Sequence, residues 1–164
     1  MKKTLVLSPI LFLVACVADP TAQPLAVTAV PLPTPIPTLA YLVPTNPPLE
    51  CGPEAAIALA QTQSDLALAA VGEVDAVQQT PSDAAVVGQT GHEAFSQALD
   101  LMKLYDVPEC LLQAKVFAVQ FFEERVAAYD ALGGGDSAGY ETHLNNGEVA
   151  RQDMITVVNG VLGQ

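Results

Sequence analysis

The chain has 164 residues, of which 18 are acidic and 6 basic, and its formal net charge is −12. Binding to nucleic acid depends on neutralising phosphates with Lys and Arg, so this balance argues against a nucleic-acid partner. The same charge opposes docking of the folded part onto anionic lipid heads. Hydrophobic residues make up 51% of the chain and aromatic residues only 5%, and the length suits one small domain.

The N-terminus has the features of an export signal that ends at a cysteine. Lys2 and Lys3 precede an apolar run of about 15 residues, which is shorter than the ~20 residues of a membrane-spanning helix. The run leads into Leu13-Val14-Ala15-Cys16, which resembles the lipobox of bacterial lipoproteins. This resemblance implies that residues 1–15 are removed and that Cys16 becomes the acylated first residue. An ordinary cleaved signal and an uncleaved anchor are the alternatives.

A lipid on Cys16 would hold the mature protein on the extracytoplasmic face of a bacterial cell membrane or outer membrane. Attachment through more than one acyl chain gives durable anchoring, whereas a single chain gives only marginal binding. The membrane is therefore the first expected partner, contacted through the lipid and not through the folded domain.

Residues 16–50 are predicted to form the lipidated N-terminus and a disordered linker. Nine prolines lie between Pro20 and Pro48. Proline fixes φ and removes an amide donor, so neither a helix nor a central strand persists here. A polyproline II spacer of this length could reach roughly 100 Å. A ligand for a proline-recognition domain is the alternative, and the apolar patch 39–43 is expected to lie against the folded domain.

Residues 51–164 are predicted to form an all-α domain, an antiparallel up-down bundle of three to four helices. The first helix should cover 54–79 and stop at Thr80-Pro81. Apolar or small side chains at helical spacing predict its buried face. That face comprises Ala60, Ser64, Ala67, Val71 and Val74.

The second helix is predicted to begin behind a Ser82 cap, with Asp83 in its first turn. A repeat of seven apolar or small residues runs from Ala84 to Tyr105. Gly88 and Gly91 weaken the helix by up to about 1 kcal/mol each relative to alanine. A start only at His92, with 81–91 as a loop, is therefore the alternative.

The third helix is predicted to begin at Asp106, because Asp106-Val107-Pro108-Glu109 has capping-box spacing and a proline in the first turn. It should run to Leu132, where three glycines follow. Its broad apolar stripe predicts burial against more than one neighbour.

The last helix should extend from a cap at Asp136 or Ser137 toward Leu162. A break or kink is expected at Asn145-Asn146-Gly147, since these residues are poor in a helix interior.

Cys51 and Cys110 are predicted to form a disulfide in an exported protein. Helices of similar length joined by short turns pack antiparallel, which places the starts of the first and third helices at the same end of the bundle. Cys51 precedes the first helix and Cys110 lies in the first turn of the third. Free thiols, or half of a metal site, are the alternative.

A resemblance covers about a third of the chain, from Asp75 to Cys110. Thr80-Pro81 between two helices, and Val107-Pro108-Glu109-Cys110 at the start of the next, resemble a group of uncharacterised bacterial lipoproteins. These share a lipobox, a proline-rich spacer and a small disulfide-closed helical domain, so the resemblance implies architecture and no activity. Its members often keep a tryptophan in the first helix, and this chain has none.

The sequence contains no strong catalytic or metal-binding motif. His92 and His143 lack the HExxH spacing of a zinc site and are expected to be exposed polar residues. Asp130 and Glu141 are spaced like the ends of a calcium loop, but positions between them lack oxygen side chains. We therefore expect no catalytic residues, no metal and no cofactor.

Two classes of function remain from the sequence. The first is a binding or interaction module displayed away from the membrane, with an envelope protein as a possible partner. The second is a structural or envelope-stress component without a specific ligand, and an enzyme is a distant third. An exposed apolar patch would favour the first class. A uniformly acidic surface would favour the second, and carboxylates buried with a histidine would favour the enzyme.

Overall fold

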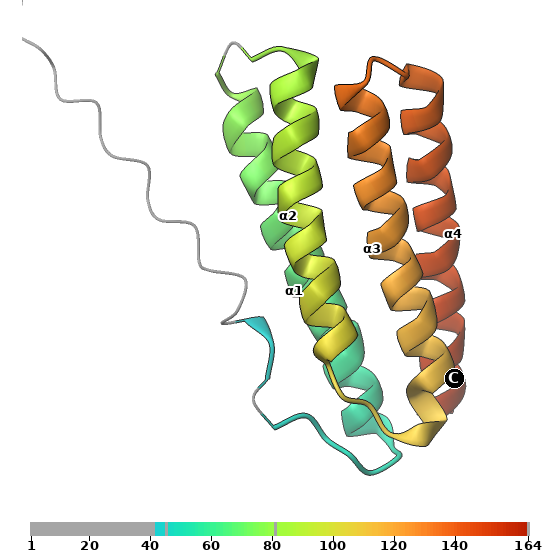
Figure 1. Cartoon of the computed structure of the whole chain (residues 1–164). Helices are drawn as coiled ribbons and strands as arrows, with labels where there is room; N and C mark the ends of the chain where they lie inside the picture. The colour runs from blue at the N-terminus through green and yellow to red at the C-terminus, as the bar shows by residue number, and fades with distance from the viewer. Residues whose placement is uncertain (1–41, 45, 81, 164) are drawn as a thin grey trace, which may run out of the picture. The chain divides into compact units, whose positions relative to one another are not determined.

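The computed structural model of the protein describes residues 42–44, 46–80 and 82–163. The lipobox and the linker up to residue 41 lie outside these residues. The described residues form an antiparallel up-down bundle of four α-helices without strands, which confirms the predicted all-α fold (Figure 1). The elements are α1 (Pro53–Gln78), α2 (Ala84–Leu104), the short 3-10 helix η2 (Glu109–Leu111), α3 (Leu112–Gly133) and α4 (Ser137–Leu162).

The buried face of α1 differs from the predicted one. Of the predicted residues only Val74 is buried in the core, and the stripe is rotated toward two large side chains, Leu59 and Leu66, which are fully buried. Alanine recurs all around this helix, so small-residue spacing alone does not fix which side faces inward. Burial of the two leucines decides which face of α1 turns inward, because the favourable free energy of burial grows with the apolar area removed from water.

The α2 helix takes the long form, so the alternative loop over 81–91 is wrong. Its N-cap is Asp83, one residue after the predicted Ser82, and the Asp83 carboxylate accepts a hydrogen bond from the Val86 amide at 2.9 Å. The Ser82 hydroxyl instead donates to the Val77 carbonyl at 3.1 Å, at the end of α1. Gly88 is buried against α3, so the glycine that weakens the helix also lets it pack closely.

The predicted start of α3 is wrong by several residues. No side-chain cap forms at Asp106, and the chain stays extended through Pro108, whose ψ is 161°. A proline disfavours helical geometry in the residue before it, here Val107. The helix therefore begins through the 3-10 turn η2, and it ends at Gly133, close to the predicted Leu132.

The α4 helix is continuous, so the predicted break at Asn145-Asn146-Gly147 is wrong. Asp136 caps it as expected, its carboxylate accepting from the Gly139 amide at 2.9 Å. Gly147 is buried against α3, and a Cβ there would lie 3.4 Å from the Glu124 Cβ. Packing against α3 holds the helix in a stretch whose intrinsic helix propensity is low.

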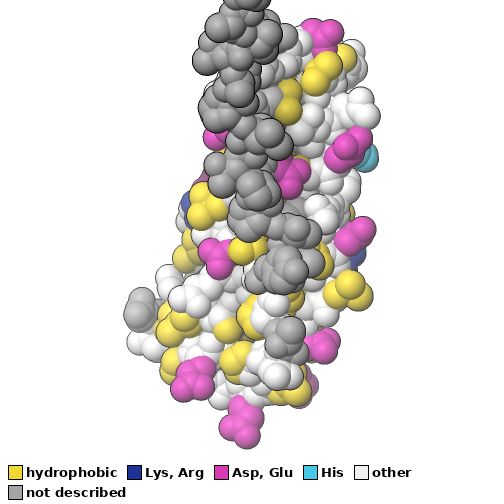
Figure 2. All heavy atoms as spheres, turned by 90° about the vertical axis from the view of Figure 1, so that its left-hand side faces the viewer, with side chains coloured by type: hydrophobic (Ala, Val, Ile, Leu, Met, Phe, Trp, Pro, Cys, Tyr) yellow, Lys and Arg dark blue, Asp and Glu magenta, His cyan; other side chains and the backbone are white. Residues whose placement is uncertain are grey.

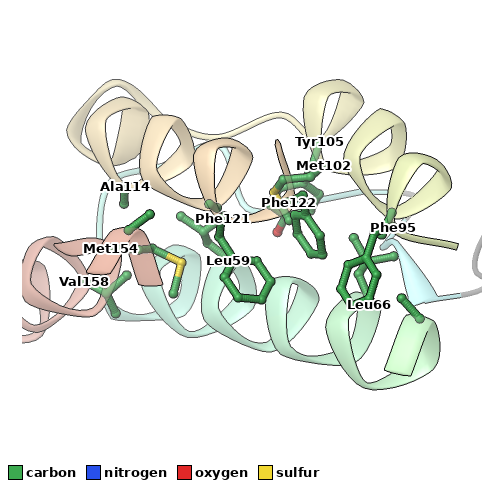
Figure 3. Close-up of a cluster of buried hydrophobic side chains, with 14 of the residues drawn as sticks. Leu59, Leu66, Phe95, Met102, Tyr105, Ala114, Phe121, Phe122, Met154 and Val158 are labelled. Carbon is green, nitrogen blue, oxygen red and sulfur yellow. The ribbon is translucent and has the colours of Figure 1, made fainter. Parts of the chain in front are cut away.

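Aromatic side chains of α2 and α3 form the centre of the core (Figure 3). Phe95 stacks on Tyr129 with ring centroids 5.3 Å apart, and Phe121 meets Phe122 edge-on at 5.0 Å. Phe95 and Phe122 are essentially fully buried. Such pairs contribute about 0.5–1.5 kcal/mol beyond the area they bury. The few aromatic side chains therefore form the centre of the core together, because the fold gathers them in one place.

The predicted disulfide is present. Cys51 and Cys110 are bonded, with 6.0 Å between their Cα atoms and a sequence separation of 59. The bond joins the segment before α1 to the start of η2, at the end of the bundle where both begin (Figure 1). The up-down topology and the pairing of the cysteines therefore agree.

Part of the segment before Cys51 packs on the bundle. Leu42 and Val43 are half-buried against the core, as expected for the apolar patch 39–43. The other three residues of that patch lie outside the described residues. None of the described helices combines the length and apolar character needed to cross a membrane.

Candidate functional site

A groove of about 380 Å³ opens beside α1 and α4. Three buried side chains of the core form apolar lining: Phe95 of α2, Phe121 of α3 and Met154 of α4. Leu68 and Val71 of α1 also line it and remain exposed, at 67% and 41%. A concave apolar site of this size falls in the range of small-molecule pockets.

The face predicted to be the core side of α1 lines this groove instead. Ala60, Ser64, Ala67 and Val71 all border it. Small residues would allow another helix to approach closely, but α4 does not fill the space beside them. The small residues of α1 that predicted a helix-packing surface therefore form one wall of the groove.

Both arginines of the chain lie at this groove, one on α3 and one on α4. The residues from Cys51 onward include 16 acidic and only 4 basic side chains. The groove contains two of these four basic side chains, so it is locally more positive than the rest of the domain. Figure 2 shows a face on which acidic side chains are spread along the domain, with hydrophobic side chains exposed between them. The groove therefore combines apolar lining with cations in a domain that is otherwise acidic.

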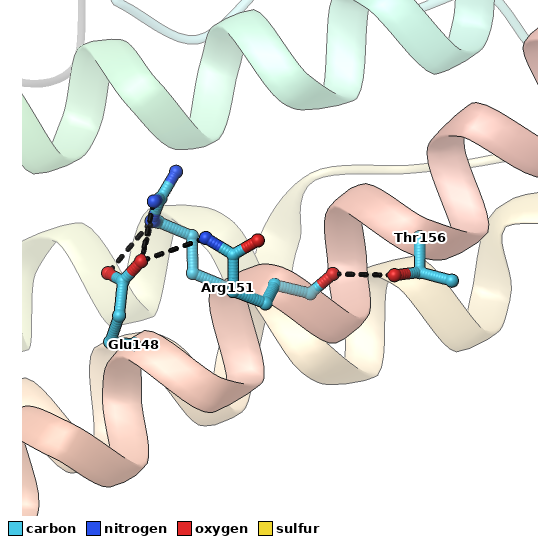
Figure 4. Close-up of polar contacts among 4 residues, drawn as sticks. Glu148, Arg151 and Thr156 are labelled. Atoms are coloured by element: carbon cyan, nitrogen blue, oxygen red, sulfur yellow. Dashed lines mark hydrogen bonds and ion pairs between the residues drawn. The ribbon is translucent and has the colours of Figure 1, made fainter. Parts of the chain in front are cut away.

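The two arginines are held differently. Arg151 forms an ion pair with Glu148, one turn earlier on α4, and its Nε donates to Glu148 Oε2 at 2.9 Å. In Figure 4 the Arg151 guanidinium extends from α4 toward α1. Arg125 lies over the Phe121 ring, 5.0 Å from its centroid, and none of the described carboxylates pairs with it. Arg125 therefore forms no ion pair, although it lies near enough to Glu148 to help lower the pKa of that carboxyl.

Glu148 stays ionised under all ordinary conditions. The hydrogen bond from Arg151, followed by one from Gln152 at 3.0 Å, lowers the pKa of Glu148 to about 2. A carboxylate with a lowered pKa favours the folded state above its unfolded pKa, and that contribution is lost only as the pH falls toward 2. With two cations and one anion, the groove carries a formal charge of +1.

Gln63 is a buried polar residue in the wall of the same groove. It lines the groove but is only 4% exposed, and its amide Nε2 has no hydrogen-bond partner among the described residues. An unmade hydrogen bond on a buried amide costs about 1–3 kcal/mol. The Nε2 atom has almost no accessible surface, so it is not presented to a ligand in the groove.

The two histidines form surface pairs with α3 and not a joint site. His92 Nδ1 lies 2.6 Å from an Asp130 oxygen, and His143 Nδ1 lies 2.8 Å from a Glu124 oxygen. Each faces a single carboxylate and remains open to solvent, as expected for exposed polar residues. Within the described ranges, no three His, Cys, Asp or Glu side chains are grouped as metal ligands.

Sequence reasoning did not identify the groove, because its members come from all four helices and only one of them, Gln63, is an unusual residue to bury. A polar amide in the middle of an alanine- and leucine-rich helix was the available signal. Neither a protein-family model, nor a curated protein, nor a solved structure matches this chain.

Proposed function

We propose that the protein is a lipid-anchored extracytoplasmic binding module, whose helical domain takes up its ligand in the groove beside α1 and α4. The groove is the observation that carries the proposal, because it places both arginines of an acidic domain on apolar lining. A purely structural component has no need for a concave apolar site that gathers its few cations. The binding module is therefore favoured over the structural alternative.

The sequence supports the location. Leu13-Val14-Ala15-Cys16 resembles a lipobox, and the proline-rich residues 16–50 would then hold the domain away from the membrane. The negative charge of the domain fits display in solvent, since it opposes adhesion to anionic lipid heads.

The anchor is tested on protein extracted from bacterial membranes. Mass spectrometry should show that residues 1–15 are missing and that Cys16 carries acyl chains. The variant Cys16→Ser should move from the membrane fraction to the soluble fraction, since its only durable membrane attachment is the lipid. An unmodified N-terminus at any other residue contradicts the anchor, and leaves the groove to be tested separately.

The groove is tested by photo-cross-linking in cells that make the full chain. A photoreactive residue at Leu68, on the groove, should yield a defined adduct, either with a protein or with a small molecule. The matched position is Leu104, which is 78% exposed and lies on α2 away from the groove. The bulky substitution Ala67→Phe, which fills the groove, should abolish the Leu68 adduct. Equal labelling at both positions would contradict a binding role for the groove.

A further inference from the structure

We infer that the ligand of this groove is an anionic amphiphile, a molecule with a carboxylate head and one apolar chain. This inference rests on the proposed function and names the chemical class that the groove would recognise. Two features carry it: an apolar lining and two arginines at the groove.

The head group follows from the polar atoms. Arg125 carries a charge that none of the described carboxylates pairs with. A carboxylate supplies acceptor oxygens and a negative charge for the guanidinium, whereas a cation or a neutral hydrogen-bond donor supplies neither. Arg151 has its Nε and one terminal nitrogen directed to Glu148, which fixes its guanidinium at the same groove.

The apolar part of the ligand follows from the lining. Phe95, Phe121 and Met154 close the groove on its inner side but are almost wholly buried. The apolar surface open to a ligand therefore comes mainly from Leu68 and Val71 of α1 and the partly buried Ile155 of α4. The exposed Leu68 and Val71 extend this surface to the solvent and would be covered by a chain lying in the groove. A fully polar anion would leave all of this surface unused.

The charge of the domain further restricts the class of ligand that can bind. An overall charge of −12 repels anions at long range. Only a ligand that gains from apolar burial as well as from the local arginines overcomes this repulsion. A small hydrophilic anion gains nothing from apolar burial, and an uncharged lipid gains nothing from the arginines. We therefore expect that binding requires the charged head and the apolar chain in one ligand.

The test uses calorimetric titration of the full chain from residue 16 onward, with Cys16→Ser so that neither lipid nor detergent is present. Three probes separate the contributions: decanoate carries both parts, decanol carries the chain without charge, and acetate carries the charge without the chain. We expect decanoate to bind at least about tenfold more tightly than either of the others, the factor that one charged hydrogen bond supplies.

Variants assign the binding to the groove. Arg125→Gln should weaken decanoate binding by about tenfold or more and leave decanol unchanged. Lys103→Gln is the matched control, because it removes the same charge from α2 outside the groove and should leave decanoate unaffected. The thermal midpoint of Arg125→Gln should change little, because Arg125 forms no ion pair among the described residues. Loss of affinity without loss of stability separates recognition from structural damage.

Flotation with phosphatidylglycerol vesicles distinguishes the source of the ligand. We expect no association of the Cys16→Ser protein, because the domain is repelled by anionic surfaces; a free carboxylate is then the source. Association that Arg125→Gln abolishes would overturn the carboxylate with one chain and place a membrane phospholipid in the groove.

Three further results would overturn the ligand class. Equal binding of decanoate and decanol, with no effect of Arg125→Gln, would show a purely apolar groove. Decanoate binding that appears only after residues 17–41 are deleted would show that the chain's own linker occupies the groove. If neither probe binds but the Leu68 adduct forms in cells, the ligand class fails and the binding module stands. If the adduct is also absent, both fail.

Discussion

Replacing Cys51 and Cys110 together by serine is expected to lower the free energy of unfolding by about 4 kcal/mol. The bond closes a loop of 59 positions, and the chain-entropy estimate for a loop of this length gives about that value. Both cysteines are exposed, so little packing is lost with the sulfurs. Small domains are stabilised by only about 5–15 kcal/mol, so the loss would be a large part of the total.

Urea denaturation followed by circular dichroism measures this effect on the chain from residue 16 onward with Cys16→Ser. Reducing the parent protein with a thiol should give the same midpoint as the double serine variant, since both open the same loop. The slope of the transition should change little if the helices themselves remain. An unchanged midpoint in both experiments, or free thiols in non-reducing peptide maps, would contradict a structural role for the bond.

Replacing Gly88 by alanine should destabilise the protein although alanine is the better helix former. A Cβ at Gly88 would lie 2.5 Å from the Gly133 Cα, which is backbone and cannot rotate away. The helices α2 and α3 would have to separate at the crossing, and overpacking of this kind costs about 1–3 kcal/mol. The gain in helix propensity, up to about 1 kcal/mol, opposes this loss only in part.

Gly72→Ala is the matched control for that substitution. Gly72 lies inside α1 and is exposed, and an added Cβ meets nothing within 4 Å. The same chemical change should therefore stabilise the protein there by about 0.5–1 kcal/mol. Thermal or urea denaturation of the two variants should give shifts of opposite sign. A stabilising effect at Gly88 would show that α2 and α3 are farther apart in solution than the contact implies.

The groove contains a residue that selection for stability alone would not be expected to keep. Filling it, or replacing Gln63 by an apolar residue, should favour folding, yet the chain keeps a buried donor without a partner there. Sites that bind ligands commonly hold groups that are unfavourable in the empty protein. Calorimetry with the probes decides whether the groove is such a site.

The amino-acid sequence by itself indicated three to four helices, most of their bounds apart from the start of α3, and the pairing of the cysteines. Turn residues such as Thr80-Pro81 and the glycines after Leu132 end helices through local backbone chemistry, which does not depend on neighbours. The capping carboxylate of Asp136 acts within its own turn, so it was also predictable. The disulfide followed from topology, because short connections force an up-down order.

The tertiary structure decided what local signals left open. Asn145-Asn146-Gly147 stays helical because Gly147 packs on α3, and the long form of α2 holds because Gly88 meets Gly133. The inward face of α1 depends on where Leu59 and Leu66 find neighbours, which an alanine-rich periodicity does not encode. The groove joins residues from four helices far apart in the chain, including Gln63 and Arg151. Its charge and shape arise only from packing, which no local pattern specifies.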